Sequence, residues 1–219
     1  MSLKAELDAF RADFAGKLPH KIRRAVARAD MDLAASGILE RALRAGDRVP
    51  DFQLRDVHAS CIRLKDLLAK GPVVLSSYRG GWCQYCNLEL QALERMLPRI
   101  IGLGAELAAI SPQTPDQSLS TAEKNGITFP VLSDVGSITA KAFGIAFEVA
   151  EELRPIYAQL GYALPDKNGD ESWTLPTPAT YVVDHDGTIA LAFLDLDYRN
   201  RLEPTDVLTV LRALRELNL

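Results

Sequence analysis

Two cysteines separated by two residues are the part of this sequence best suited to chemistry. Cys83 and Cys86 follow Gly80-Gly81 and precede a run of strong helix formers that continues to Leu97. Residues at this spacing share one face of a helix, where two sulfur atoms can approach closely enough to form a disulfide. The first turn of a helix also favours a thiolate, because its N–H groups are unpaired and its dipole end is positive. The pair therefore predicts reversible thiol–disulfide chemistry.

The elements expected around this pair alternate between strand and helix. Val73-Val74-Leu75, just before the motif, indicates a buried strand, and the motif itself begins a helix. Further strands are predicted at 105–110, 129–132, 179–183 and 188–193, with helices between and after them. This alternation predicts an α/β fold, a mixed central sheet flanked by helices. The cysteines then lie at a strand-to-helix turn, where such folds place their sites.

Residues 1–46 are expected to form an N-terminal helical extension, separate from a domain that covers residues 47–219. Four apolar residues of the extension share one helical face: Leu3, Leu7, Phe10 and Phe14. This face must be buried somewhere, either on the main domain or in a homodimer. Within the domain, the polar and turn-rich segment 161–176 is expected to form a surface insertion.

Composition limits the classes of protein to which this chain can belong. The 219 residues are 47% hydrophobic, which is enough to bury a core, and the net charge of −4 argues against a nucleic-acid binder. The sequence lacks an apolar run long enough to span a membrane and an apolar signal segment at its start, so we expect a cytoplasmic protein. Three cysteines are too few for a disulfide scaffold, and a close pair in a reducing compartment is more often catalytic than structural.

Three segments occur in a characteristic order. They are Gly46-Asp47-Arg48-Val49-Pro50-Asp51-Phe52, Trp82-Cys83-Gln84-Tyr85-Cys86 and Pro178-Ala179-Thr180-Tyr181-Val182-Val183-Asp184-His185-Asp186-Gly187. Together they resemble the peroxiredoxin-like proteins of the alkyl hydroperoxide reductase/thiol-specific antioxidant family, within the thioredoxin superfamily. The resemblance covers roughly residues 46–219 and implies a thioredoxin-like fold.

The same resemblance implies an antioxidant thiol peroxidase with Cys83 and Cys86 as catalytic residues. Its substrate would be a hydroperoxide, and its electrons would come from an external thiol reductant such as a thioredoxin or glutathione system. It implies no bound cofactor, no metal, no nucleic acid and no membrane as a partner. It also implies that Trp82 and Pro178 flank the cysteines, with a cis peptide bond before Pro178.

The motif departs from the family in its supporting residues. The family pattern Pro-x-x-x-Thr-x-x-Cys falls on Arg79, Cys83 and Cys86, so the proline and the threonine are both replaced. The arginine that supports the reactive thiolate in the family is not evident either. Arg199 and Arg201 follow the last predicted strand, and each is expected to be an ordinary surface charge.

Three functions remain open at this point. In a peroxidase, Cys86 would attack the peroxide and Cys83 would resolve the sulfenic acid. In a dithiol–disulfide oxidoreductase acting on protein disulfides, Cys83 would attack and Cys86 would release the mixed disulfide. The third function is a non-enzymatic redox sensor or binding module. Cys61 is expected to be a small apolar residue far from the motif, and the histidines lack the spacing of metal ligands: His20, His58 and His185.

Overall fold

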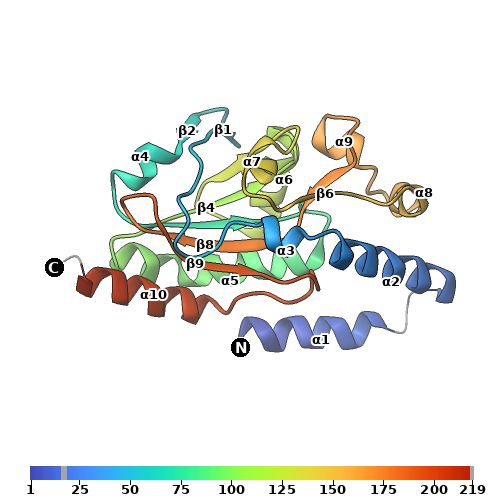
Figure 1. The fold of residues 1–219 in the computed structure, drawn as a ribbon, viewed down its shortest axis with the longest axis horizontal. Helices are drawn as coiled ribbons and strands as arrows, with labels where there is room; N and C mark the ends of the chain where they lie inside the picture. The colour runs from blue at the N-terminus through green and yellow to red at the C-terminus, as the bar shows by residue number, and fades with distance from the viewer. Residues whose placement is uncertain (16–18, 218–219) are drawn as a thin grey trace.

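The computed structural model of the chain describes residues 1–15 and 19–217 (Figure 1). Residues 16–18 of the predicted extension and residues 218–219 of the predicted domain lie outside the described residues. A mixed sheet of seven strands runs through the centre in the order β2-β1-β5-β4-β3-β8-β9. The strands are β1 (Gln53–Asp56), β2 (Cys61–Arg63), β3 (Val73–Ser77), β4 (Glu106–Ser111), β5 (Val131–Ser133), β8 (Ala179–Val183) and β9 (Ile189–Leu194).

Strand β3 lies near the middle of the sheet and determines where the cysteines come. It pairs in parallel with β4 and antiparallel with β8, so its residues are covered on both sides. The alternation of side chains along β3 directs Val74 to one face of the sheet and Val73 and Leu75 to the other. Burial of apolar side chains of this size stabilises the fold by about 1.5–3 kcal/mol each. These observations confirm the predicted mixed sheet flanked by helices.

Helices cover both faces of this sheet (Figure 1). The face that carries Val74 packs against α1 (Leu3–Ala15), α5 (Gln84–Gly102) and α10 (Pro204–Leu217). The opposite face packs against α4 (Leu64–Leu68) and α7 (Ile138–Ala142), and α6 (Pro115–Asn125) lies beside β5 and α5. Helix α5 therefore begins at the end of β3 and runs beneath the centre of the sheet, which places the motif at a strand-to-helix turn as predicted.

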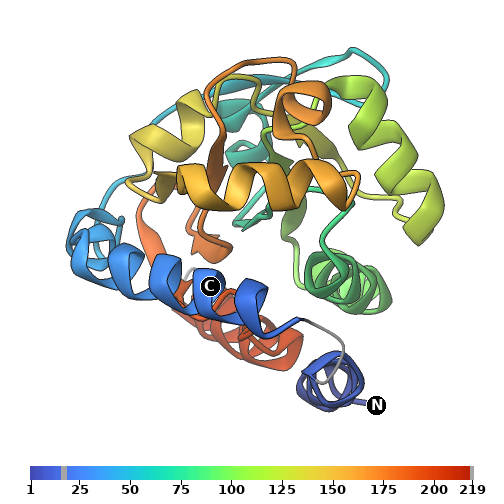
Figure 2. The same ribbon diagram turned by 90° about the vertical axis from the view of Figure 1, so that its right-hand side faces the viewer.

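The extension packs on the domain of its own chain. Leu3 and Leu7 of α1 are only 2% and 5% exposed and lie against α5, which is the first of the two predicted ways to bury this face. Helix α2 (His20–Ala35) behaves differently, because its residues are half-buried or exposed. Figure 2 shows α2 below a helix of the later chain, α8 (Arg154–Gln159), and α2 contacts the short 3₁₀ turn Glu151–Leu153 just before it. The extension ends at α3 (Ile38–Arg41), where Ile38 is fully buried.

The segment predicted as a surface insertion is partly buried, so that prediction is wrong. Strand β7 (Thr174–Pro176) pairs with β6 (Ala146–Glu148), and a short helix, α9 (Leu164–Asn168), lies between them in sequence. Leu164 and Leu175 are fully buried and form a third small core with side chains of the 149–153 region. Two apolar residues in a polar stretch give no periodic signal, which is why the sequence did not reveal them.

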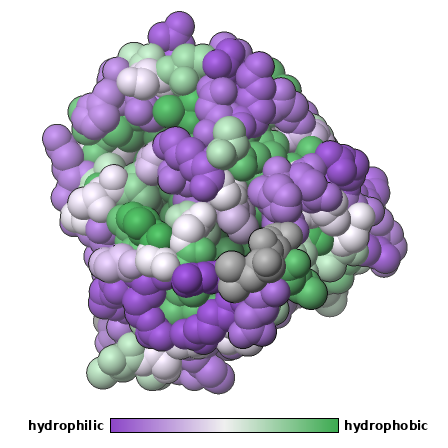
Figure 3. Space-filling view, turned by 90° about the vertical axis from the view of Figure 1, so that its left-hand side faces the viewer, coloured by the Kyte–Doolittle hydropathy of each residue, from purple (hydrophilic) through white to green (hydrophobic). Residues whose placement is uncertain are grey.

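One face of the molecule shows where the charged and polar residues of the sequence lie. Figure 3 shows a face on which hydrophilic side chains predominate and hydrophobic atoms lie mainly in recesses between them. Across the residues that the structure describes, no helix combines the length and the apolar character needed to cross a bilayer.

Candidate active site

The two cysteines of the motif lie together at the start of α5. Cys83 is the N-cap residue and Cys86 lies in the first turn, with 2.7 Å between their sulfur atoms. Both are free thiols in this structure, so the predicted intramotif disulfide is not formed. Cys83 is 5% exposed and lines a cavity of about 510 Å³, whereas Cys86 is fully buried and lies outside the lining. Cys83 is therefore the sulfur that a molecule in the cavity can reach.

The surroundings give the two thiols opposite tendencies to ionise. Burial opposes ionisation of Cys83, but the thiol of Cys86 and the charges of Arg79 and Arg201 outweigh it and lower the pKa of Cys83 to about 6. Burial raises the pKa of Cys86 well above its usual value, and the hydrogen bond to Cys83 raises it further. At neutral pH these effects favour the thiolate on Cys83 and the thiol on Cys86.

Arg79 places a buried positive charge beside this thiolate. Its side chain is 6% exposed and donates a hydrogen bond to the hydroxyl of Tyr157. The guanidinium lies 4.4 Å from the ring centre of Tyr198 and 5.1 Å from that of Trp82, so aromatic faces surround it. Within the described part of the chain, the Nε atom of Arg79 and the Nε1 atom of Trp82 are buried and have no hydrogen-bond partner.

A buried ion pair lies on the other side of Cys86. The Nε atom of Arg201 donates to Glu89 at 2.6 Å, and its Nη2 atom lies 3.5 Å from the sulfur of Cys86. Both side chains of the pair are 2% exposed, and Thr180 also donates to Glu89. Burial raises the pKa of Glu89 to about 7 against the opposing charge of Arg201. The prediction that Arg201 is a surface charge is therefore wrong, whereas Arg199 forms a partly exposed pair with Asp197.

Side-chain hydrogen bonds hold the motif loop between β3 and α5. The backbone N–H of Gly81 donates to the side chain of Gln113 at 2.8 Å, and the side chain of Asn87 donates to the carbonyl of Gly81 at 2.9 Å. Gly80 has a φ of +142°, and a Cβ atom there would lie 2.5 Å from the indole nitrogen of Trp82. The loop therefore requires glycine at this position to bring Trp82 beside Cys83.

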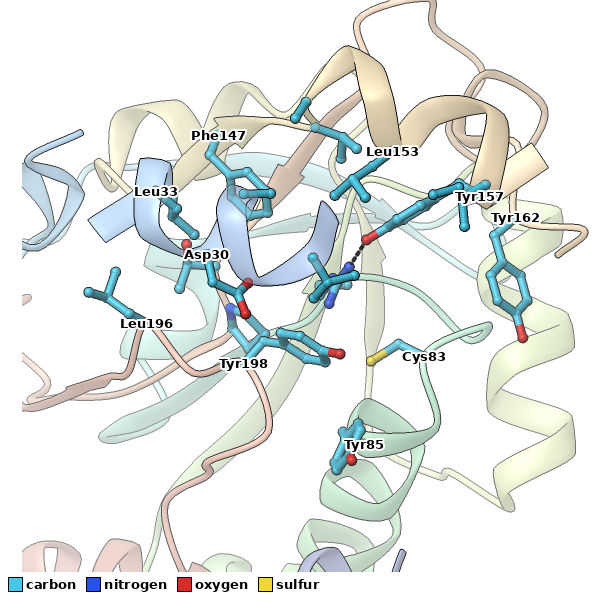
Figure 4. A pocket seen from close by; sticks show the side chains of 18 of the residues that line it. Asp30, Leu33, Cys83, Tyr85, Phe147, Leu153, Tyr157, Tyr162, Leu196 and Tyr198 are labelled. Atoms are coloured by element: carbon cyan, nitrogen blue, oxygen red, sulfur yellow. Dashed lines mark hydrogen bonds between the residues drawn. The ribbon is translucent and has the colours of Figure 1, made fainter. Parts of the chain in front are cut away.

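Segments far apart in sequence form the cavity above Cys83 (Figure 4). Trp82 and Pro178, the two flanking residues implied by the resemblance, line it. The remaining walls come from α1, α2, the 146–162 region and the loop after β9, mostly through apolar side chains: Phe10, Ile22, Val26, Ala29, Leu33, Phe147, Leu153, Tyr157, Tyr162 and Tyr198. Figure 4 shows the sulfur of Cys83 directed toward the side of the cavity where Tyr198 and Asp30 lie.

The peptide bond before Pro178 is trans, so the expected cis bond is wrong. The backbone N–H of Thr177 donates to the carbonyl of Ile145 at 2.8 Å, and Ala179 already pairs with Ser77 in the sheet. The chain therefore runs in an extended form from β7 into β8, which suits the trans form that X–Pro bonds favour by about 0.5–1 kcal/mol.

The remaining sequence candidates lie away from the cavity. Cys61 is exposed on β2 at an edge of the sheet, and the three histidines are exposed as well: His20, His58 and His185. Within residues 1–15 and 19–217, no cluster of three or more His, Cys, Asp or Glu could hold a metal ion. Glu89 is not among the site residues predicted from the sequence, although an acid three residues after Cys86 on the helix's buried face was a usable signal.

Comparisons with known proteins agree on the type of fold. A family model described as AhpC/TSA family matches residues 45–192. The chain is 30% identical over 105 residues to thiol-disulfide oxidoreductase ResA of Geobacillus thermodenitrificans, a match that covers 48% of this chain and 59% of that protein. Among solved structures, peroxidoxin BcpB of Mycobacterium tuberculosis has a TM-score of 0.62 at 23% identity and covers 78% of this chain and 97% of its own. PrxQ of Xylella fastidiosa has a TM-score of 0.61 at 20% identity, with 78% and 96% covered.

Proposed function

The chain belongs to the AhpC/TSA family, and from that premise we propose that it is a thiol peroxidase in which Cys83 attacks a hydroperoxide and Cys86 resolves the product. One observation carries the proposal above the others. The ionised sulfur of Cys83 lines a cavity of about 510 Å³, which admits a small molecule. The 5% exposure of Cys83 leaves little surface on which a folded protein could present a disulfide.

The reaction follows from the protonation states of the pair. The Cys83 thiolate attacks one peroxide oxygen, the O–O bond breaks, and Cys83 is oxidised to a sulfenic acid. The alkoxide or hydroxide that leaves takes from water the proton that Cys83 released when it ionised, and departs as an alcohol or as water. Cys86 then attacks the sulfenic sulfur, a disulfide forms, and the hydroxyl leaves as water with the proton of Cys86. An external dithiol or two monothiols supply the two electrons that restore both thiols. A thioredoxin or glutathione system fits this requirement.

The proposal reverses the order of attack that the family pattern suggested for a peroxidase. Alignment of the pattern assigns attack to Cys86, but Cys86 is fully buried and its pKa is raised. Cys83 lines the cavity and its pKa is lowered to about 6. Because the thiolate is the nucleophile, these differences favour Cys83 as the attacking residue and Cys86 as the resolving one.

The second candidate function is reduction or oxidation of disulfides. It is supported by the similarity to ResA and by the ionised first cysteine of the pair, the position that attacks in a dithiol–disulfide oxidoreductase. This function requires that a substrate disulfide reach Cys83 past the side chains of α2 and the 146–162 region, which a small disulfide can do more easily than a protein.

Variants in which one cysteine is replaced by serine, assayed in parallel, test both functions. Consumption of hydroperoxide and reduction of insulin disulfides are measured with an excess of thiol reductant for the wild type, Cys83→Ser, Cys86→Ser and the control Cys61→Ser. We expect Cys83→Ser to lose peroxide consumption, Cys86→Ser to react once without turnover, and Cys61→Ser to match the wild type. A Cys83→Ser protein that consumes hydroperoxide at the wild-type rate contradicts the assignment, and activity on insulin alone supports the second function.

A further inference from the structure

The apolar face of α2 is turned toward the cavity. Ile22, Val26, Ala29 and Leu33 recur at helical spacing and all line it. The apolar stripe of a surface helix ordinarily packs into a core. Here the same stripe is only half-buried, although α1 beside it buries Leu3 and Leu7 almost completely. Val26 and Ala29 also pack against the small core that contains Val149 and Leu153, and the part of the stripe that stays uncovered faces an open volume next to Cys83.

The size of this volume exceeds what hydrogen peroxide needs. A water molecule takes about 30 Å³ in the liquid, and the cavity measures about 510 Å³. Cavities of 300–1,000 Å³ with mainly apolar walls are typical of sites that enclose organic molecules. Aromatic side chains face α2 across the cavity, among them Tyr162, which stacks on Trp82 with 5.3 Å between ring centres. An apolar molecule between these walls would remove apolar surface from water on both sides.

Polar side chains line the cavity both beside the reactive sulfur and along its wall, where Asp30, Asp32, Ser36, Arg41 and Glu148 lie. Arg79 is 6% exposed, lines the cavity and has a buried Nε–H without a partner in the described chain, and the same holds for the buried Nε1–H of Trp82. Both atoms are shielded from the cavity, so Arg79 acts on an oxygen atom at Cys83 through its charge rather than through this N–H group. The cavity thus combines a buried cation near Cys83 with apolar side chains along α2.

From this arrangement we propose that α2, an element outside the segment that the family model matches, is the specificity wall of the site: it selects, among hydroperoxides, those whose apolar body fills the space beside it. The peroxide oxygens would lie at Cys83, near the charge of Arg79, and the apolar body would contact Val26, Ala29 and Leu33. Since the family model matches from residue 45 onward, this wall is built by residues outside the matched segment. The inference rests on the proposed peroxidase function for its chemistry, but the binding site stands on the cavity alone.

Substitutions on the two faces of α2 test the specificity wall. Ala29 lines the cavity, whereas Ala27 on the same helix is exposed, so Ala29→Trp and Ala27→Trp are matched in size and element. We measure kcat/KM for cumene hydroperoxide and for hydrogen peroxide with one thiol reductant. The wild type is expected to prefer cumene hydroperoxide. Ala29→Trp should lower the ratio of kcat/KM for cumene hydroperoxide to kcat/KM for hydrogen peroxide about tenfold or more, and Ala27→Trp should leave this ratio at the wild-type value. Equal losses for both peroxides in Ala29→Trp, or no preference in the wild type, would overturn the proposal.

A binding measurement separates this inference from the peroxidase function. Cumyl alcohol, the product analogue, is added while Cys83 is alkylated by iodoacetamide in a Cys61→Ser background, and alkylation is mapped by mass spectrometry. Protection of Cys83 that is lost in Ala29→Trp and in Val26→Trp supports the apolar site even if neither peroxide is consumed. Alkylation at the same rate with and without the alcohol refutes the site, whatever the activity. Circular dichroism of each variant verifies that α2 remains helical.

Discussion

At the residue scale, two buried guanidinium groups flank the cysteine pair and favour a negative charge on the sulfur atom of Cys83. Arg79 stands beside Cys83 in a group of aromatic rings, and Arg201 joins Cys86 to the carboxyl of Glu89. Both cations lower the pKa of Cys83, and Cys86 donates its thiol hydrogen to the same sulfur. The thiolate is thereby stabilised although it lies away from bulk water, which is the condition that a buried nucleophile needs.

The first prediction concerns the pH dependence of Cys83. Because its pKa is lowered to about 6, the thiolate is lost below that pH and fully present above it. The rate of alkylation of Cys83 by iodoacetamide, followed by peptide mass spectrometry, should therefore rise through pH 6 and then level off. In Cys86→Ala the donor to the sulfur is gone, so the inflection should move to higher pH. An inflection in the wild type near about 8.5, the value of an ordinary thiol, contradicts the assignment.

The second prediction concerns Arg79. Arg79→Met keeps much of the side-chain volume and removes the charge, so the pKa of Cys83 should rise. Loss of one neighbouring cation typically shifts a pKa by a unit or more. A rise of one unit from about 6 lowers the thiolate fraction at pH 6, so the reaction of Cys83 with hydroperoxide at that pH should slow about fivefold or more. Stopped-flow fluorescence of the reduced protein measures this rate. The control is Arg63→Met. Arg63 ends β2, and its exposed guanidinium pairs with Asp66 of α4. Equal rates for both variants would remove Arg79 from the site.

At the scale of elements, a strand, a glycine turn and a helix place the cysteines, and these three were predictable. The β-branched run at 73–75, the Gly-Gly pair and the leucine spacing after it are local signals, and the structure has β3, the loop and α5 at these positions. The charged side chains that surround the two cysteines were not predictable in this way. Arg201 reaches Glu89 across 112 residues of sequence, and a contact between segments so far apart leaves no periodic pattern in either one.

The third prediction concerns the turn itself. Gly80→Ala would put a Cβ atom 2.5 Å from the indole nitrogen of Trp82 at a φ of +142°, so the loop must shift. We expect a loss of about 1–3 kcal/mol in the free energy of unfolding and a weaker reaction of Cys83. Gly102→Ala is the matched control, because a Cβ atom there meets nothing within 4 Å. Urea unfolding of the two reduced variants compares them directly. Equal free energies would show that the loop tolerates a side chain at position 80.

At the scale of the whole molecule, the site is built by the domain and by the extension together. The proposed division into residues 1–46 and 47–219 separates α1 to α3 from the sheet, yet α1 is fixed on α5 and α2 forms a wall of the cavity. The sequence showed that the apolar faces of the extension must be buried, but it left open where. The answer depends on tertiary packing with α5 and with the 146–162 region. Val149 and Leu153 of that region form a small core with Leu164 and Leu175, the two buried leucines that the sequence did not reveal.

The proposed role for this architecture is control of access. Cys83 lies at the base of a cavity whose walls come from three separate parts of the chain, and Cys86 lies beneath it. A cavity with apolar walls above the sulfur of Cys83 would admit a small organic oxidant and would hinder large molecules. The same walls limit which thiol reductant can reach the disulfide afterwards, so the reductant would have to be small or would have to enter by a narrow contact.

The most direct measurement is the intact mass of the reduced protein after one equivalent of cumene hydroperoxide, with the modified residues mapped on peptides. The account predicts that the wild type loses the mass of both thiol hydrogens through a bond between Cys83 and Cys86, and that Cys86→Ser gains one oxygen on Cys83. An oxygen that appears on Cys86 in Cys83→Ser at the wild-type rate would contradict the account, as would oxidation confined to Cys61.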